Sequence, residues 1–165
     1  MIANEYCISK GKGSSTNGLP SFDKALLDAG VGNYNLVRLS SILPADCTYV
    51  DVKDITAHIK EGSLLPTAYS TITSDVEGET IVSTIGVGIP KDKSNVGVIM
   101  EYSTKHVTEK EALETLESMI DEAFVERGWE LDKKLVTAIS DKVEVGGVKH
   151  TTFCCISEWV SESRN

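Results

Sequence analysis

The chain has 165 residues, 41% of them hydrophobic, which is enough for one buried core and too few for two. Its formal net charge is -9, from 16 basic and 25 acidic residues, so nucleic acid and anionic membrane surfaces are disfavoured as partners. The sequence has no apolar stretch long enough to cross a bilayer and no secretion signal at its start. We therefore expect a single domain in the cytoplasm.

Cysteine and histidine usage predicts neither disulfides nor a metal site. The four cysteines are too few and too scattered for a disulfide framework, so reduced thiols are expected. Cys154 and Cys155 are adjacent in a β-favouring segment, where neighbouring side chains point to opposite faces, so we expect them to pack in the core. None of the three histidines has a second ligand type at metal spacing.

The first 30 residues predict a loop followed by a short helix. Residues 9–18, "SKGKGSSTNG", are rich in Gly and Ser without periodicity, which indicates a flexible arm; their glycines fit no phosphate-binding loop. Ser21 is suited to cap a helix over residues 22–29, with Asp23 in its first turn and Gly30 at its end. The apolar face of this helix would consist of Phe22, Ala25, Leu26 and Ala29.

After Asn33 the pattern changes to β. At least six segments are enriched in Val, Ile, Thr and aromatic residues and separated by turn residues: 35–43, 64–75, 79–90, 96–104, 135–140 and 149–160. One strong helix interrupts them at residues 108–127, with a capping box of Thr108 and Glu111 and a stop at Gly128. Two helices with mostly antiparallel strands predict an α+β sandwich.

A serine pair interrupts the apolar run "VRLSSILP" just before Pro44. The pair Ser40-Ser41 is weak evidence alone, since Ser14-Ser15 is a second such pair. In context, the run resembles the self-cleavage segment of the pyruvoyl-dependent arginine decarboxylases. Five blocks resemble that family in its order: "FDKALLDAGVGNYNLVRLSSILP", "LLPTAYSTITSDVEGETI", "GIPKDKS", "VIMEY" and "GWELD".

The resemblance implies that the chain cuts itself between Ser40 and Ser41. The Ser41 hydroxyl would attack the Ser40 carbonyl and convert the peptide bond to an ester, which requires close placement and donors to the developing oxyanion. Elimination and loss of ammonia would then leave a covalently bound pyruvoyl group at residue 41. The mature protein would consist of two chains, residues 1–40 and 41–165.

The resemblance also implies roles for three polar side chains. Glu101 would donate a proton after CO2 leaves; the alternative is an exposed acid at a strand end. Asn35 would assist self-cleavage by donating to the Ser40 carbonyl; alone, it is typical of a turn. Asp23 would bind the substrate guanidinium through paired hydrogen bonds; the alternative is a favourable charge in the first turn of a helix.

The remaining implications concern the pocket, the assembly and the reaction. Gly32 and Tyr34 would line the pocket through backbone contacts. The family implies a four-layer αββα sandwich and homotrimers with sites between protomers, leaving hexamers open. The implied reaction converts L-arginine to agmatine and CO2 for polyamine synthesis. Two alternatives stay open: a pyruvoyl-dependent decarboxylase of another amino acid, and a non-processed paralogue acting as a structural subunit.

Overall fold

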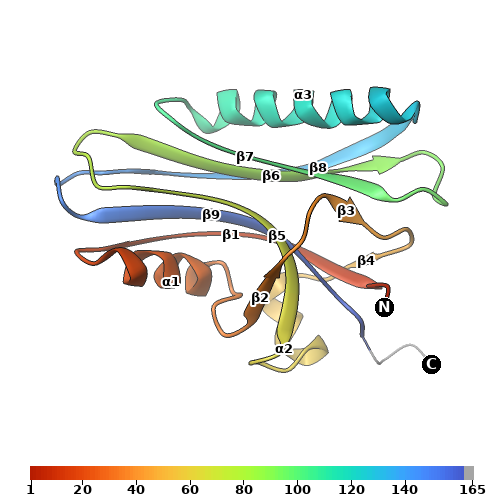
Figure 1. The fold of residues 1–165 in the computed structure, drawn as a ribbon, viewed down its shortest axis with the longest axis horizontal. Helices are drawn as coiled ribbons and strands as arrows, with labels where there is room; N and C mark the ends of the chain where they lie inside the picture. The colour runs from red at the N-terminus through yellow and green to blue at the C-terminus, as the bar shows by residue number, and fades with distance from the viewer. Residues whose placement is uncertain (162–165) are drawn as a thin grey trace.

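Two β-sheets stack face to face between two long helices in the computed structural model, which describes residues 1–161 (Figure 1). Helix α1 (Gly18–Asp28) covers the first sheet and α3 (Glu109–Arg127) covers the second. The predicted α+β, four-layer αββα sandwich is therefore confirmed, as are two main helices; a short 3-10 helix (Val52–Asp54) and α2 (Ile55–His58) lie in a connection.

The strands of both sheets pair mostly antiparallel. In spatial order, the first sheet contains β2 (Asn35–Arg38), β5 (Leu64–Ser74), β9 (Lys149–Trp159), β1 (Glu5–Ser15) and β4 (Thr48–Tyr49). The second sheet contains β3 (Ile42–Leu43), β7 (Gly97–Lys105), β6 (Thr80–Pro90) and β8 (Leu131–Lys142). The pairs β1 with β4 and β2 with β5 are parallel.

The prediction of a flexible arm at residues 9–18 is wrong, because most of this segment belongs to β1 and pairs with β9 along its length. Its glycines have a packing role. A β-carbon at Gly11 would lie 2.3 Å from the carbonyl oxygen of Ala25, and one at Gly13 would lie 2.5 Å from Cβ of Lys24. The two glycines let α1 lie directly on the strand.

Helix α1 begins one turn earlier than predicted, after Asn17. Ser21 is therefore inside the helix rather than at its cap, and its buried hydroxyl hydrogen-bonds the Thr151 hydroxyl at 2.9 Å. Asp23 lies beyond the first turn, so favourable first-turn charge does not explain it. The predicted stop is confirmed, since Gly30 follows the helix with a φ of 80°.

The predicted helix at 108–127 is confirmed with both of its ends. Thr108 and Glu111 form the capping box, and Gly128 ends the helix in the left-handed conformation with a φ of 65°. Its buried face packs on the second sheet and consists of Ala112, Leu116, Ile120, Ala123 and Phe124.

The segment predicted as one strand at 35–43 divides between the two sheets. Its first part is β2 and its last two residues are β3, so residues 39–41 cross from one sheet to the other (Figure 1). The Leu39 N–H donates to the Thr67 carbonyl on β5 at 3.0 Å, whereas the Ser41 carbonyl accepts from the Ile99 N–H on β7 at 2.7 Å. The serine pair therefore lies at this crossing.

Strand β9 separates two hydrophobic layers. Cys155 packs in the layer beneath α1 and Cys154 packs between the sheets, which confirms that the adjacent thiols point to opposite faces. All four cysteines are free thiols, and burial raises the pKa of Cys154 to about 12. Among the described residues, no helix is long and apolar enough to span a membrane.

Candidate active site

The bond between Ser40 and Ser41 lies between two anchored stretches of backbone. Leu39 is bound to the edge of the first sheet, and the two residues after Ser41 pair with β7 in the second sheet. Ser40 is exposed and Ser41 is half-buried. A peptide bond tied on either side to a different sheet is held in a defined position, which an intramolecular acyl shift requires.

Glu101 projects from the middle of β7 toward the space between the sheets. It lies two residues from Ile99, which packs in that space, and side chains two apart in a strand share a face. Glu101 lies inside β7 and its side chain is 32% exposed, so it is not a fully exposed acid at a strand end. Oε1 accepts from Arg38 Nη2 at 2.7 Å, whereas Oε2 is buried and has no hydrogen-bond partner among residues 1–161.

Arg38 was not predicted as a site residue. It is the last residue of β2. Its guanidinium lies over the Tyr69 ring, with Cζ 4.5 Å from the ring centroid. The same Nη2 atom donates to the Tyr69 carbonyl at 3.4 Å. The hydrogen bond and charge of Glu101 raise the pKa of Arg38. In the sequence, the only signal was a single cation within an apolar run three residues before Ser41.

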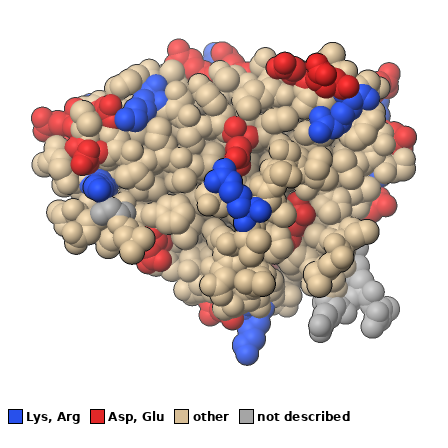
Figure 2. All heavy atoms as spheres, in the orientation of Figure 1, with Lys and Arg blue, Asp and Glu red and all other residues tan. Residues whose placement is uncertain are grey.

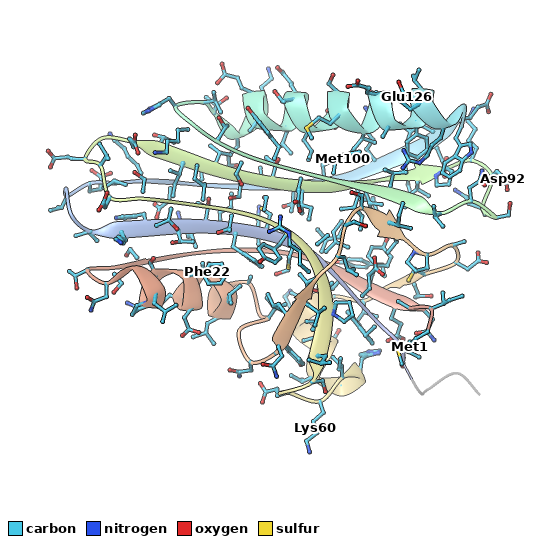
Figure 3. The ribbon with its side chains drawn as sticks, viewed as in Figure 1. Met1, Phe22, Lys60, Asp92, Met100 and Glu126 are labelled. Carbon is cyan, nitrogen blue, oxygen red and sulfur yellow. The ribbon has the colours of Figure 1, made fainter. Side chains whose placement is uncertain are left out.

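Asp23 lies in a different layer from Glu101. It is exposed on α1, beside a shallow hollow lined by Phe22 and Leu26, on the outer side of the first sheet. Figure 3 shows Phe22 on α1 and Met100 on β7 in separate layers of the sandwich. A single chain therefore does not bring Asp23 to Glu101.

Asn35 lies at the opposite end of β2 from Arg38. Its side-chain amide donates to the Gly62 carbonyl at 2.8 Å, and its backbone N–H donates to the Ser63 carbonyl at 3.0 Å. The predicted hydrogen bond to the Ser40 carbonyl is consequently not made within one chain, because the amide is held by the loop before β5.

The loop between α1 and β2 is fixed by Tyr34 and Gly32. The Tyr34 ring is 8% exposed in the core beneath α1, and its hydroxyl donates to the Ile59 carbonyl at 3.1 Å. Burial raises the pKa of Tyr34. A β-carbon at Gly32 would lie 2.7 Å from Cδ2 of Leu27, so this residue allows a close approach. The loop backbone has a defined position next to Asn35.

The residues around Ser41 fit a covalent carbonyl group derived from that serine. The group would be attached to β3, whose partner strand β7 carries Glu101. The buried Oε2 atom of Glu101 has no hydrogen-bond partner in the described part of the chain, so it is free to contact a reacting group bound there. No cluster of three or more His, Cys, Asp or Glu side chains arranged to hold a metal occurs in residues 1–161.

Known proteins of one family are similar to this chain over most of its length. The profile of the family described as pyruvoyl-dependent arginine decarboxylase matches residues 5–160. A protein of that name from Methanococcus aeolicus is 42% identical over 156 residues, covering 94% of this chain and 90% of its own. Another, from Methanocaldococcus jannaschii, is 44% identical over 143 residues, covering 87% and 84%. A solved pyruvoyl-dependent histidine decarboxylase aligns at 18% identity and a TM-score of 0.47, covering 63% of this chain and 54% of that one.

Proposed function

The chain belongs to the pyruvoyl-dependent arginine decarboxylase family, and on this premise we propose that it converts L-arginine to agmatine and CO2. The observation that carries the proposal is the placement of Ser41 beside β7. The Ser41 carbonyl is bound by the Ile99 N–H, two residues along the strand from Glu101. The residue that would become the cofactor and the residue that would supply a proton are thus held on one pair of strands.

Self-cleavage would divide the chain into residues 1–40 and 41–165. The Ser41 hydroxyl attacks the Ser40 carbonyl, and the anchors on both sides of the bond limit the motion that would separate the reacting atoms. The two products stay together after cleavage because β1, in the first, pairs along its whole length with β9, in the second. Helix α1 also packs on both of these strands.

A pyruvoyl group at residue 41 supplies an electrophilic carbonyl that binds the substrate amine and withdraws electrons from the bond to the carboxylate. Glu101 then delivers a proton to the carbon that has lost CO2. Its position between the sheets limits contact with water, because the side chain is only about one-third exposed. The pair with Arg38 further limits its orientation.

Sites between subunits of a homotrimer would bring the remaining polar residues to the reaction. Asp23 and Asn35 are exposed, and one chain leaves both away from Glu101. Exposed apolar side chains surround the loop between them, as at a subunit interface: Leu27, Val37 and Leu64 are 51%, 44% and 69% exposed. Charged side chains occupy only a small part of the face drawn in Figure 2. Pairing of trimers into hexamers would require a second surface, and either assembly permits this arrangement.

In such a site each residue has a distinct task. Asp23 from an adjacent subunit would bind the guanidinium of arginine with two hydrogen bonds, which selects a cationic side chain. Asn35 would approach the neighbouring Ser40 carbonyl during cleavage. Gly32 and Tyr34 would present the loop backbone to the pocket. We place this activity in the cytoplasm, in the supply of agmatine for polyamine synthesis.

Intact-mass measurement of the purified protein and a substrate panel together test the proposal. We expect two fragments divided at Ser40, CO2 release from arginine above that from ornithine, lysine and histidine, and neither result for Ser41→Ala. A single uncut chain of 17.9 kDa would instead indicate the structural-subunit alternative. Equal rates on all four amino acids would refute the substrate assignment but would not contradict the proposed self-cleavage.

A further inference from the structure

Arg38 and Glu101 form an asymmetric ion pair. The guanidinium contacts Oε1 at 2.7 Å, and Oε2 is buried without a partner among the described residues. A guanidinium has only hydrogen-bond donors, so Oε1 of Glu101, which faces Arg38, acts as the acceptor. A proton on Oε1 pointing at Arg38 would meet another donor. When Glu101 is protonated within this pair, its proton therefore belongs on Oε2.

We propose that Arg38 is a positioning residue, which occupies Oε1 of Glu101 and thereby places the proton used in decarboxylation on Oε2. The inference rests on the proposed function, in which Glu101 is the proton donor. In the step itself, the bond from the substrate carbon to the carboxylate breaks and its electron pair stays on that carbon. A new C–H bond forms with the proton from Oε2, and the carboxylate left behind regains a proton from solvent.

The surroundings of Arg38 hold its guanidinium in place although the side chain is 57% exposed. Tyr69 contributes twice, through its ring face beneath Cζ and through its carbonyl oxygen. The backbone just beyond Arg38 is fixed by the Leu39 N–H, which donates to Thr67. A planar group stacked on an aromatic ring and bound at its edge loses little freedom when it also binds a carboxylate.

A fixed donor atom predicts a fixed product configuration. In D2O, decarboxylation adds one deuterium to the carbon of agmatine that carried the carboxylate. If the proton always arrives from Oε2 on one side, the labelled product has a single configuration at that carbon. Without Arg38, the carboxyl group of Glu101 loses its fixed orientation and delivers its proton more slowly. Solvent then competes from the opposite face of the carbon, so both configurations form.

The test compares Arg38→Met, which keeps the length of the side chain and removes its donors, with Arg38→Lys, which retains a cation. We expect Arg38→Met to lower kcat about 10- to 100-fold with KM changed far less, and to give agmatine of mixed configuration. Arg38→Lys should restore most of the single configuration. A matched control is Arg127→Met, since Arg127 also lies over an aromatic ring, that of Trp129, and donates to the Ala123 carbonyl on α3.

A second measurement needs neither cleavage nor cofactor. In the uncleaved Ser41→Ala protein, the guanidinium protons of Arg38 should give slowly exchanging NMR signals that disappear when Glu101→Ala, which removes both acceptor oxygens, is added. This measurement stays decisive if Arg38→Met does not cleave. Guanidinium signals unaffected by Glu101→Ala, or a single product configuration with unchanged kcat in Arg38→Met, would overturn the inference. Absence of arginine decarboxylation in the unsubstituted protein would overturn the proposed function and leave the ion pair testable by NMR.

Discussion

The Ile99 N–H donates to the Ser41 carbonyl at 2.7 Å and so joins the crossing between the sheets to the strand that carries Glu101. Strand β3 has only two residues, which pair with β7. This hydrogen bond continues that pairing by one residue in the direction of Glu101. The proposed self-cleavage and proton delivery would therefore depend on the same short stretch of paired backbone.

Replacing the proposed donor should separate cleavage from decarboxylation. We expect Glu101→Gln to cut itself normally but to lose about 10²- to 10⁴-fold in kcat, because an amide of the same size has no acidic proton to deliver. Intact mass and CO2 release measure the two steps. Glu130→Gln is the control, since Glu130 is an exposed carboxylate paired with Lys91 outside the site. A kcat close to that of the unsubstituted protein would exclude Glu101 as the donor.

Asp23 should act on substrate affinity rather than on cleavage. We expect Asp23→Asn to raise KM for arginine about 10- to 100-fold, the loss that follows when a charge-assisted hydrogen bond is weakened. The matched control on the same helix is Asp28→Asn, whose side-chain oxygen can still accept from the Lys12 N–H. Steady-state kinetics on arginine decide the question, and an unchanged KM in Asp23→Asn would contradict guanidinium binding there.

The close packing of α1 on β1 predicts a stability cost at Gly11. A β-carbon there would meet backbone atoms of Ala25 and Ala29 at 2.3 and 2.4 Å, so Gly11→Ala should lower the free energy of unfolding by about 1–3 kcal/mol. Urea unfolding in the Ser41→Ala background avoids the complication of two chains. At Gly146 the nearest atom is 3.6 Å away, so Gly146→Ala should change stability by less than about 1 kcal/mol. Equal stability of the two variants would argue against the packing.

Glu158 should make stability depend on pH. Burial raises its pKa from 4.5 to about 7, and its Oε1 has no hydrogen-bond partner in residues 1–161. Between these two values the unfolded carboxyl is ionised while the folded one keeps its proton, so the free energy of unfolding falls as pH rises through this window. The total fall attributable to Glu158 is up to about 3 kcal/mol.

The variant Glu158→Gln should remove this part of the pH dependence, because an amide does not ionise. Unfolding of the Ser41→Ala protein by urea at a series of pH values from 4 to about 8 measures the effect. Glu144→Gln, at an exposed position, should leave the slope unchanged. The same slope with and without Glu158→Gln would show that this carboxyl titrates normally.

Local chemistry was enough to predict some elements in full. Helix α3 was predicted with both ends because its signals are contacts within a few residues, from the Thr108 and Glu111 capping box to the left-handed Gly128. The opposite orientation of Cys154 and Cys155 followed from the alternation of any β-strand. The family was indicated by five ordered blocks of sequence, and residues 5–160 match its profile.

Strand β1 and the start of α1 were decided by partners distant in the sequence. By local propensity Gly11 weakens a strand. Its missing side chain becomes favourable only because α1 packs directly on it. Ser21 is a good cap in isolation, yet it is buried inside α1 against Thr151, which is 130 residues away. Propensity is a weak local term that packing of this kind overrides.

By itself, the sequence determined the family, the serine pair and the residue types that the proposed chemistry requires. Only the tertiary structure decided which polar side chains meet within one chain. It joins Arg38 to Glu101, 63 residues apart in the sequence, and leaves Asp23 in another layer. The physical reason is that β2 and β3 belong to different sheets. The pairing of each sheet, rather than the local pattern of residues 35–43, sets where the crossing and its side chains lie.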